Sequence, residues 1–460
     1  MISLHFLHTN DLHSHFDRWG MLVDYLNRER IRLREMGEPQ LTLDLGDQMD
    51  RFHPMTEGLL GAGNVTLLNE AGYDYVTIGN NEGITFTKQR LSAMYKHSRF
   101  SVILANLYEK DGRRPSWCSP YTIVTMKGVR VGLIGLTAAF PKYYRVLGWD
   151  IRDPFAELKQ DLQQLMGRTD LVVLMSHVGL PFDKRVAEEM AGIDVIIGAH
   201  THHALERGLT VDGTLIAQAG KYGRYCGHVV VDYDEQARRI VHKGADLITL
   251  RGEADDSADR EVRRLTAAAV ANMQQVVVSL RRPLIVDWYH DSPLPQVLAD
   301  ALREWCRADI GMVNAGVILG DLPAGPVTRY AIHHICPHPI NPCKVNVTGA
   351  ELLEMIAIGL KKSFQTYELK GFGFRGKRLG KLMFSHLSYR VDQAETARIA
   401  DVRINGEPLR PERTYSLGTI DVFTMGTFLP PVVRAEQTFF LPETLRDLLA
   451  WRLQTIKPFT

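Results

Sequence analysis

Apolar runs without polar alternation constrain the fold of this chain most. Such runs are typical of strands that are covered on both faces, and helical patterns such as Met21–Met36 and Phe155–Met166 separate several of them. This alternation predicts an α/β domain over residues 1–250. The runs are Leu4–Leu7, Leu41–Leu45, Tyr75–Ile78, Val102–Leu104, Val129–Leu136, Leu171–Met175, Val195–Ile197 and Val229–Val231.

The chain has 460 residues, too many for one ordinary domain, so we expect two. The stretch 251–282 is predicted to link them through one helix over Ser257–Leu280, which Pro283 would stop. Residues 283–460 predict a smaller mixed α/β domain, with helices expected at Leu294–Arg307, Ala350–Leu360 and Pro442–Thr455.

The hydrophobic content of 45% and the charged content of 23% are typical of a soluble globular protein. The net charge of +1 offers no overall field for a nucleic-acid polymer or a membrane surface. No apolar run approaches the roughly 20 residues of a membrane helix. The five cysteines form no C-x-x-C pair, which fits free thiols. The start, Met1–His5, does not resemble a signal peptide, and we expect a cytoplasmic protein. The oligomeric state is not predicted.

Five short polar segments bear side chains that bind metals, and most of them begin where an apolar run ends. Any one of these residues alone would be read as a turn former or a helix cap, but the ordered set is hard to explain by coincidence. Imidazoles combined with carboxylate and amide oxygens suit a pair of ions such as Mn²⁺, Zn²⁺ or Fe²⁺. The set predicts a hydrolase that uses a metal-activated water. It comprises Asp11, His13, Asp47, Asn80, His177, His200 and His202.

The spacing of these residues is consistent with a shared site. Asp11 and His13 are two apart, so both can point the same way from a strand end. Asp47 follows Gly46, and Asn80 follows a glycine too, which allows sharp turns of the backbone. Sites in α/β proteins lie at the carboxyl ends of strands, where these segments are expected.

The pattern D-x-H, G-D, G-N-x-E, S-H-x-G, G-x-H-x-H resembles the calcineurin-like metallophosphoesterase superfamily. The opening L-H-T-N-D-L-H and the second domain narrow the resemblance to the 5′-nucleotidase family. It implies a four-layer β-sandwich flanked by helices, followed by a C-terminal substrate-binding domain. It also implies two divalent metal ions and attack on phosphorus by a hydroxide between them.

The resemblance implies a role for each candidate ligand. Asp11, His13 and His202 would hold one ion, and Asp47 would bridge. The second ion would be completed by Asn80, His177 and His200.

The chain departs from the family motif G-N-H-E-F-D, whose His and final Asp assist the leaving alcohol. Asn81 and Ile84 occupy those positions. Asn81 can donate a hydrogen bond to a phosphoryl oxygen but cannot act as an imidazolium acid. Three outcomes are open: a low rate, a substrate with a good leaving group, or a substitute residue. The nearby candidates for a substitute are His15, His53 and His203.

The second domain also departs from the family. The family usually has an N-G-G-x-R motif whose arginine contacts substrate. The matching stretch here is Asn314–Leu319, and Leu319 stands in place of that arginine. Arg375, Lys377 or Arg378, in a glycine-rich loop, could supply that charge. Thr348–Leu352 and Tyr415–Phe423 resemble retained family segments, although the closing G-G-D is reduced to Met425–Thr427. For the two rings that would clamp a base, we expect Phe423 and either Phe372 or Phe374.

These features favour a 5′-nucleotidase that releases phosphate from a nucleoside 5′-monophosphate. One alternative is hydrolysis of 2′,3′-cyclic nucleotides, nucleotide sugars or other pyrophosphates. Another is a weakly catalytic nucleotide-binding sensor, motivated by Asn81 and Ile84.

Overall fold

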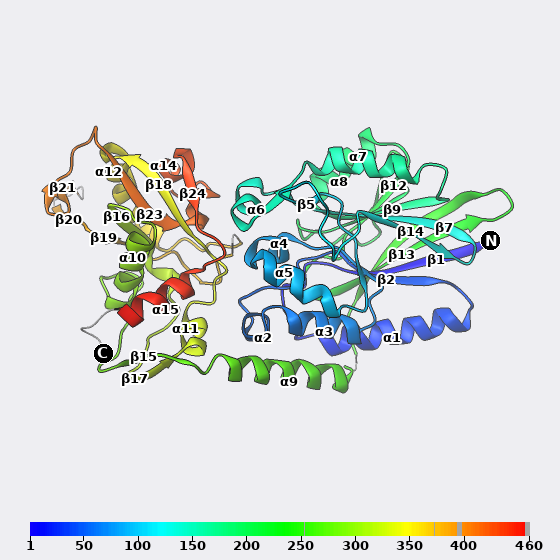
Figure 1. The fold of residues 1–460 in the computed structure, drawn as a ribbon, viewed down its shortest axis with the longest axis horizontal. Helices are drawn as coiled ribbons and strands as arrows, with labels where there is room; N and C mark the ends of the chain where they lie inside the picture. Colours follow the sequence, from blue (N-terminus) through cyan, green and yellow to red (C-terminus); the bar gives the residue numbers. More distant parts are fainter. Residues whose placement is uncertain (253, 372, 393–397, 456–460) are drawn as a thin grey trace. The chain divides into compact units, whose positions relative to one another are not determined.

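The chain forms two compact units, which are drawn in Figure 1. The computed structural model describes residues 1–460 apart from 253, 372, 393–397 and 456–460. Unit 1 comprises Met1–Ala269 and unit 2 comprises Val270–Thr460. Both combine helices with sheets, which confirms the predicted α/β class. Within the described ranges, no helix is long and apolar enough to cross a membrane.

Two six-stranded sheets form the centre of unit 1. In each sheet four neighbouring strands run parallel, so their carboxyl ends meet at one edge. The first sheet has the order β14 (Arg239–Thr249), β13 (Tyr225–Asp234), β1 (Ile2–Thr9), β2 (Gln40–Asp44), β3 (Tyr75–Val76), β4 (Ser101–Val102). The second has the order β11 (Leu209–Val211), β12 (Thr214–Ala217), β10 (Val195–Gly198), β9 (Leu171–His177), β7 (Val129–Thr137), β6 (Tyr121–Met126).

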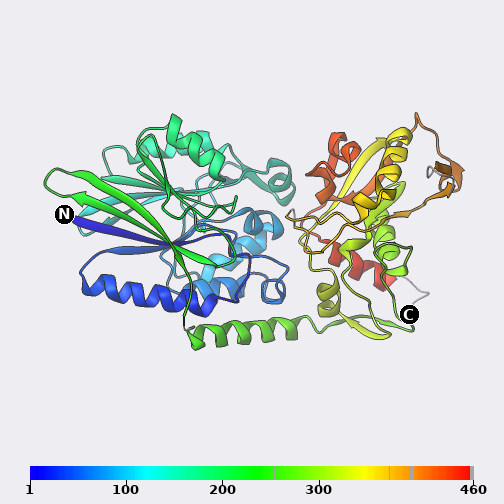
Figure 2. The ribbon, with the colours of Figure 1, turned by 180° about the vertical axis from the view of Figure 1, so that it is seen from behind.

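The main core of unit 1 lies between these two sheets. Phe6 and Leu43 of the first sheet belong to the same buried cluster as Val131, Val173 and Ile197 of the second. Burying one such side chain contributes about 1.5–3 kcal/mol. The long antiparallel hairpin of β13 and β14 runs beside β1 and is seen from behind in Figure 2.

Helices cover the outer faces of the sandwich. The second sheet packs through residues such as Ile134 and Leu174 against Leu158 of α7 (Pro154–Leu165) and Val186 of α8 (Leu180–Glu189). On the first sheet, α1 (Trp19–Glu35) buries the side of the helix that carries Leu26. Helix, sheet, sheet and helix therefore give the four layers that the resemblance implied. The remaining helices of this sandwich are α2 (Pro54–Gly58), α3 (Ala62–Glu70), α4 (Asn80–Thr85), α5 (Lys88–Met94) and α6 (Pro141–Leu147).

The predicted linker helix is shorter than expected. Helix α9 covers Asp256–Asn272, and strand β15 (Val276–Leu280) follows. The prediction of a helix to Leu280 was wrong because the β-branched valines, which also accept an extended conformation, pair with a distant strand. This strand pairs with β17 (Gly325–Thr328) in unit 2.

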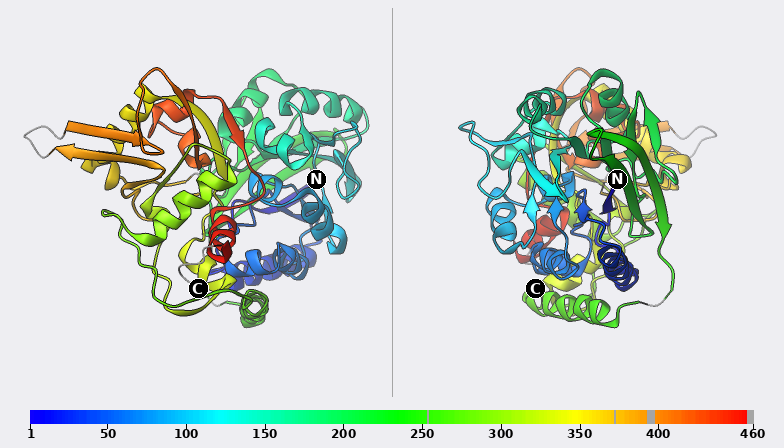
Figure 3. Two further views of the ribbon diagram at one scale, coloured as in Figure 1. Left: turned by 60° about the vertical axis from the view of Figure 1, so that its left-hand side comes forward. Right: turned by 90° about the vertical axis from the view of Figure 1, so that its right-hand side faces the viewer.

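Unit 2 is built on a five-stranded sheet. A separate hairpin of β20 (Leu387–Asp392) and β21 (Arg398–Ile404), with β22 (Glu407–Pro408), projects from the body of this unit, as the left view of Figure 3 shows. The five-stranded sheet has the order β19 (Leu382–Ser385), β16 (Ile310–Asn314), β23 (Thr414–Ile420), β18 (Pro342–Thr348), β24 (Gln437–Phe439). The main helices are α10 (Pro293–Trp305), α11 (Arg329–Ile335), α12 (Gly349–Leu360) and α15 (Leu445–Thr455).

Candidate metal centre

The seven candidate ligands follow the carboxyl ends of neighbouring parallel strands in unit 1. Asp11 and His13 follow β1, Asp47 follows β2, and Asn80 is the first residue of α4 after β3. In the second sheet, His177 ends β9, and the remaining two histidines, His200 and His202, follow β10. Loops at this edge of parallel sheets are the usual place for a site in an α/β protein.

Six of these residues form two groups of three, and within each group the possible ligand atoms lie within 4.8 Å of one another. The first group contains Asp11, His13 and His202. Nε2 of His13 lies 3.2 Å from Nε2 of His202, although 189 positions separate the two residues. The second group contains Asp47, His177 and His200.

The carboxylate of Asp47 lies between the two groups. Its Oδ1 is 3.5 Å from Nε2 of His177, and its Oδ2 is 3.7 Å from Nε2 of His13. The Asp11 carboxylate also approaches both groups, with Oδ1 3.4 Å from Nε2 of His202 and 3.9 Å from Nε2 of His177. Two carboxylates flanked by four imidazoles suit a pair of divalent cations.

The backbone at this site is unusual. Five of the candidate ligands have positive φ, between 49° and 71°, a region that side chains other than glycine rarely adopt. Such conformations persist where the surrounding structure enforces them, and they cluster at functional sites. The five residues are Asp11, His13, Asp47, His200 and His202.

Two glycines and one buried carboxylate hold the loops of Asp47 and Asn80 together. A Cβ on Gly46 would lie 2.9 Å from Cα of Gly79, so only glycine permits this approach. The Glu82 carboxylate accepts hydrogen bonds from the backbone N–H groups of Asp47 (2.9 Å), Met49 (2.8 Å) and Gly79 (2.8 Å). Both loops therefore depend on the first turn of α4.

Two buried atoms indicate that cations fit here. Nδ1 of His177 donates to the carbonyl oxygen of Leu45 at 2.6 Å, so Nε2 is the ring nitrogen that faces Asp47 and could bind a metal in place of its proton. That Nε2 and Oδ1 of Asn80 are both buried without a hydrogen-bond partner. A buried polar atom without a partner lowers the stability of the folded state by about 1–3 kcal/mol. A metal ion would give a partner to both Nε2 of His177 and Oδ1 of Asn80.

The electrostatics of the cluster lead to the same conclusion. Burial alone would raise the pKa of Asp47, but the neighbouring His177 and His13 hold it well below its usual range. Burial would lower the pKa of His177, yet Asp47 and Asp11 raise it to about 10. Because the carboxylates hold protons on the adjacent imidazoles, positive charge is favoured at this place, and a divalent cation can replace those protons.

Asn81 supports a candidate ligand in this structure. Its Nδ2 lies 2.9 Å from Nδ1 of His13 and donates to the carbonyl oxygen of Met49 at 3.0 Å. Its backbone N–H donates to Oδ1 of Asp47 at 2.8 Å. The sequence suggested that the side-chain amide of Asn81 could donate to a phosphoryl oxygen. Its Nδ2 would then have to give up its contact with His13 or with Met49.

The three histidines considered as substitutes for the missing acid have different surroundings. Nδ1 of His53 accepts a hydrogen bond from the N–H of Met55 at the start of α2, and Nδ1 of the exposed His203 lies 2.9 Å from the hydroxyl of Thr201. The centroid of the His15 ring lies 3.9 Å from that of Tyr222, with the two rings tilted by 41°. None of these contacts places the imidazole on a candidate ligand.

Unit 2 buries the rings that the sequence suggested for base stacking. Phe423 is fully buried, and Phe374 is 4% exposed and stacks on His338 at 5.3 Å. Phe372 lies outside the described residues. Stacking of a base on Phe374 or Phe423 would require their neighbours to move.

The cationic loop of unit 2 is more accessible. Arg378 is exposed and donates to the hydroxyl of Tyr289 at 3.3 Å, and Lys377 is exposed as well. Arg375 is half-buried, with a guanidinium N–H that donates to the carbonyl oxygen of Phe374 at 3.2 Å. Leu319, where the family has arginine, is half-buried.

A pair of accessible rings in unit 2 escaped the sequence reasoning. Tyr367 is 47% exposed, and its ring lies 5.4 Å from that of Phe428. Phe428 directly follows Met425–Thr427, the stretch where the family has G-G-D, so its position could have been noticed. Nothing in the sequence near Tyr367 indicated its exposure.

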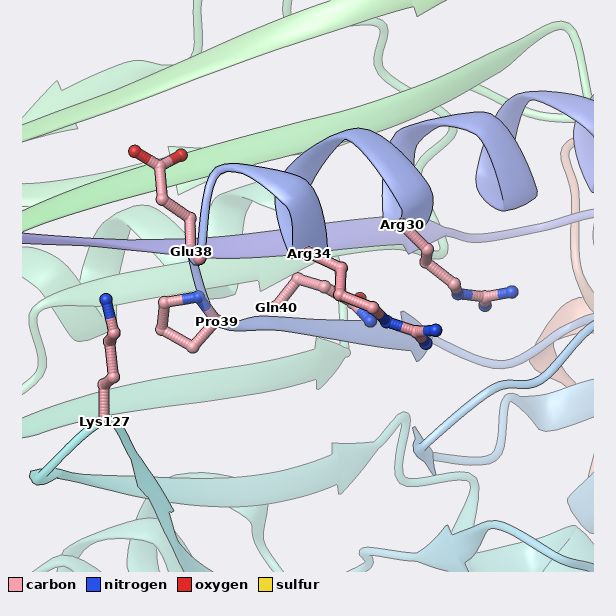
Figure 4. A pocket seen from close by; sticks show the side chains of 7 residues that line it. Arg30, Arg34, Glu38, Pro39, Gln40 and Lys127 are labelled. Atoms are coloured by element: carbon pink, nitrogen blue, oxygen red, sulfur yellow. The ribbon is translucent and has the colours of Figure 1, made fainter.

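A hollow shown in Figure 4 lies away from the metal centre, where α1 ends and β2 begins. Arg30, Arg34 and Lys127 line it. The Arg30 guanidinium donates to the carbonyl oxygens of Ala71 (2.7 Å) and Gly72 (2.8 Å), so its charge stabilises the fold.

Comparison with known proteins reveals two family matches that together cover most of the chain. The calcineurin-like phosphoesterase model matches residues 4–204, and the model of the 5′-nucleotidase C-terminal domain matches residues 270–428. The uncharacterized metallophosphoesterase YunD of Bacillus subtilis is 42% identical, over 98% of this chain and 99% of its own length.

Solved structures share the fold along the whole chain. A putative 5′-nucleotidase from Staphylococcus aureus has a TM-score of 0.69 at 18% identity, and covers 99% of this chain and 97% of its own. The NAD nucleotidase of Haemophilus influenzae has a TM-score of 0.68 at 16% identity, over 98% of this chain and 95% of its own.

Proposed function

Because this chain belongs to the calcineurin-like phosphoesterases and carries a 5′-nucleotidase C-terminal domain, we propose that it hydrolyses nucleoside 5′-monophosphates to nucleoside and phosphate. Members of this family are metal-dependent phosphoester hydrolases, and so is this protein. The substrate and the individual site residues are our proposal.

The position of Asp47 between two groups of ligand atoms carries this proposal. We assign Asp11, His13 and His202 to one ion, and Asp47 to both. The second ion is completed by Asn80, His177 and His200. The unsatisfied atoms of His177 and Asn80 support the second assignment.

Two divalent ions would activate water as a nucleophile and stabilise charge on the phosphoryl oxygens. The protein fixes their positions, because Glu82 ties the Asp47 and Gly79 backbones to α4. Asn81 orients His13, because its Nδ2, held by the carbonyl oxygen of Met49 at 3.0 Å, lies 2.9 Å from Nδ1 of the ring and leaves Nε2 facing the candidate ligands.

No imidazole at position 81 protonates the leaving group. General-acid assistance typically contributes about 10²–10⁴-fold, so a leaving group of low pKa is favoured. This feature supports our second candidate, hydrolysis of a pyrophosphate or of a cyclic diester. It weighs less than the C-terminal domain, which is that of a 5′-nucleotidase.

For substrate contacts we propose the accessible side chains of unit 2. Tyr367 and Phe428 offer ring surface for a base, and Arg378 offers a cation for the phosphate. Phe374, Phe423 and Arg375 stay secondary candidates because two are buried and the third is partly enclosed.

The test is phosphate release from AMP, cyclic AMP isomers and UDP-glucose by metal-stripped protein refilled with Mn²⁺ or Zn²⁺. We expect metal-dependent turnover of AMP and its loss in Asp47→Asn, with the cyclic esters and UDP-glucose as poorer substrates. Turnover confined to the diesters or to UDP-glucose would move the function to the second candidate. Nucleotide binding without turnover under either metal would indicate the sensor.

A further inference from the structure

A second hollow in unit 1 begins immediately after the His13 position. It has a volume of about 380 Å³, which is in the range of small-molecule sites. One wall is formed by the chain from Ser14 to Asp17, and another by Phe52 and His53. Helix α9 supplies a third wall through residues that include Val262.

A row of aromatic rings connects this hollow to the metal centre. The ring of His13, a candidate ligand, lies 5.9 Å from that of Tyr222. The Tyr222 ring lies 3.9 Å from that of His15, tilted by 41°, and the His15 ring lies 5.1 Å from that of Phe52. A planar ligand in the hollow would therefore extend a series of rings that begins at the metal centre.

The polar groups of the hollow favour a ring that donates hydrogen bonds. The carboxylates of Asp17 and Asp259 line it together with one guanidinium, that of Arg263, and Oδ1 of Asp259 already accepts the backbone N–H of Gly20 at 2.9 Å. An excess of acceptors suits the amino groups of a heterocycle and disfavours a second phosphate. Because Nδ1 of His53 accepts the N–H of Met55, its neutral ring carries the proton on Nε2, a donor for a ring nitrogen.

We propose that this hollow is a second base-binding subsite, which takes the heterocyclic base on the other side of the scissile phosphate. The substrate class is then two nucleosides joined through a pyrophosphate. The inference rests on the proposed function, and it narrows the substrate of the same metal centre.

The chemistry of such a substrate fits the residues at the site. Water adds its oxygen to phosphorus, the bridging P–O bond breaks, and the departing phosphate leaves as an anion. The released proton passes to solvent, and two nucleoside monophosphates result. A departing phosphate is far less basic than an alkoxide, so it needs no acid at Asn81 or Ile84.

The experiment compares diadenosine pyrophosphate with ADP, which has the same linkage and only one base. Two variants alter the hollow: Val262→Trp fills it from α9, and Phe52→Ala removes one of its aromatic rings. The control is Ala268→Trp, which places the same bulk on an exposed site of α9. We expect both pocket variants to raise KM for diadenosine pyrophosphate about 10-fold relative to ADP. The control should leave this ratio at its wild-type value.

Equal changes for the two substrates, or no change in either pocket variant, would overturn the subsite while the proposed function stands. If the wild type hydrolyses neither these substrates nor AMP, the proposed function fails. Adenosine binding, measured by saturation-transfer NMR on the same proteins, then decides the subsite. Weaker binding in Val262→Trp than in Ala268→Trp supports it, and equal or absent binding overturns it.

Discussion

Replacing Gly79 with alanine tests whether the close approach of two loops sets the metal centre. A Cβ at this residue would lie 2.5 Å from the Asp47 backbone nitrogen and 2.6 Å from its Cγ. Nonbonded heavy atoms prefer about 3.5–4.0 Å, so the Asp47 carboxylate must move by about 1 Å. The backbone here has φ −93° and ψ −174°, which alanine adopts without strain, so the effect is steric.

A displacement of about 1 Å at a catalytic site lowers turnover about 100-fold. The assay measures hydrolysis of 4-nitrophenyl phosphate and of its bis ester, together with bound metal by mass spectrometry. Gly320→Ala is the control, because its Cβ would find Ile335 Cγ2 at an ordinary 3.5 Å. If Gly79→Ala kept wild-type turnover and both metals, the reasoning from loop contact would be refuted.

Four further substitutions provide separate tests. Asn81→Ala removes a contact to His13 and should lower the affinity for Mn²⁺ about 10–100-fold in a metal titration. Unchanged affinity would show that the contact is dispensable. Phe423→Ala should lower the free energy of unfolding, measured by denaturant titration, by about 3–5 kcal/mol because the ring is fully buried. Tyr367→Ala should leave that free energy unchanged and raise KM for AMP in steady-state kinetics, because its ring is exposed. Burial and the neighbouring His5 lower the pKa of His228 to about 4. The unfolded chain then binds a proton that the native state excludes, so stability falls as the pH drops from about 6.5 toward 4, by up to about 3 kcal/mol. His228→Gln should flatten that dependence in thermal unfolding, and an unaltered slope would assign it to other groups.

The sequence determined the strands of unit 1 and the order of the polar segments that follow them. Apolar runs such as Leu41–Leu45 encode a buried strand locally, and the glycine after the run marks the turn that presents Asp47. The family resemblance rests on the same short-range patterns. Family models match most of the chain for that reason.

Sequence reasoning failed where the outcome depends on distant partners. The valines after Asn272 form a strand because β17 pairs with them. The role of Phe423 as a stacking ring stays a prediction, but the sequence did not show that the packing of unit 2 buries this ring and leaves Tyr367 accessible.

Only the tertiary structure placed Asp47 between two groups of ligand atoms. It also directed the Asn81 side chain to His13 and formed the hollow between the His53 loop and α9. Local periodicity fixes which face of an element is apolar, whereas burial and hydrogen-bond partners depend on chain segments that meet only in the folded state. His13 and His202 illustrate the difference: their ring nitrogens are 3.2 Å apart across 189 positions of sequence.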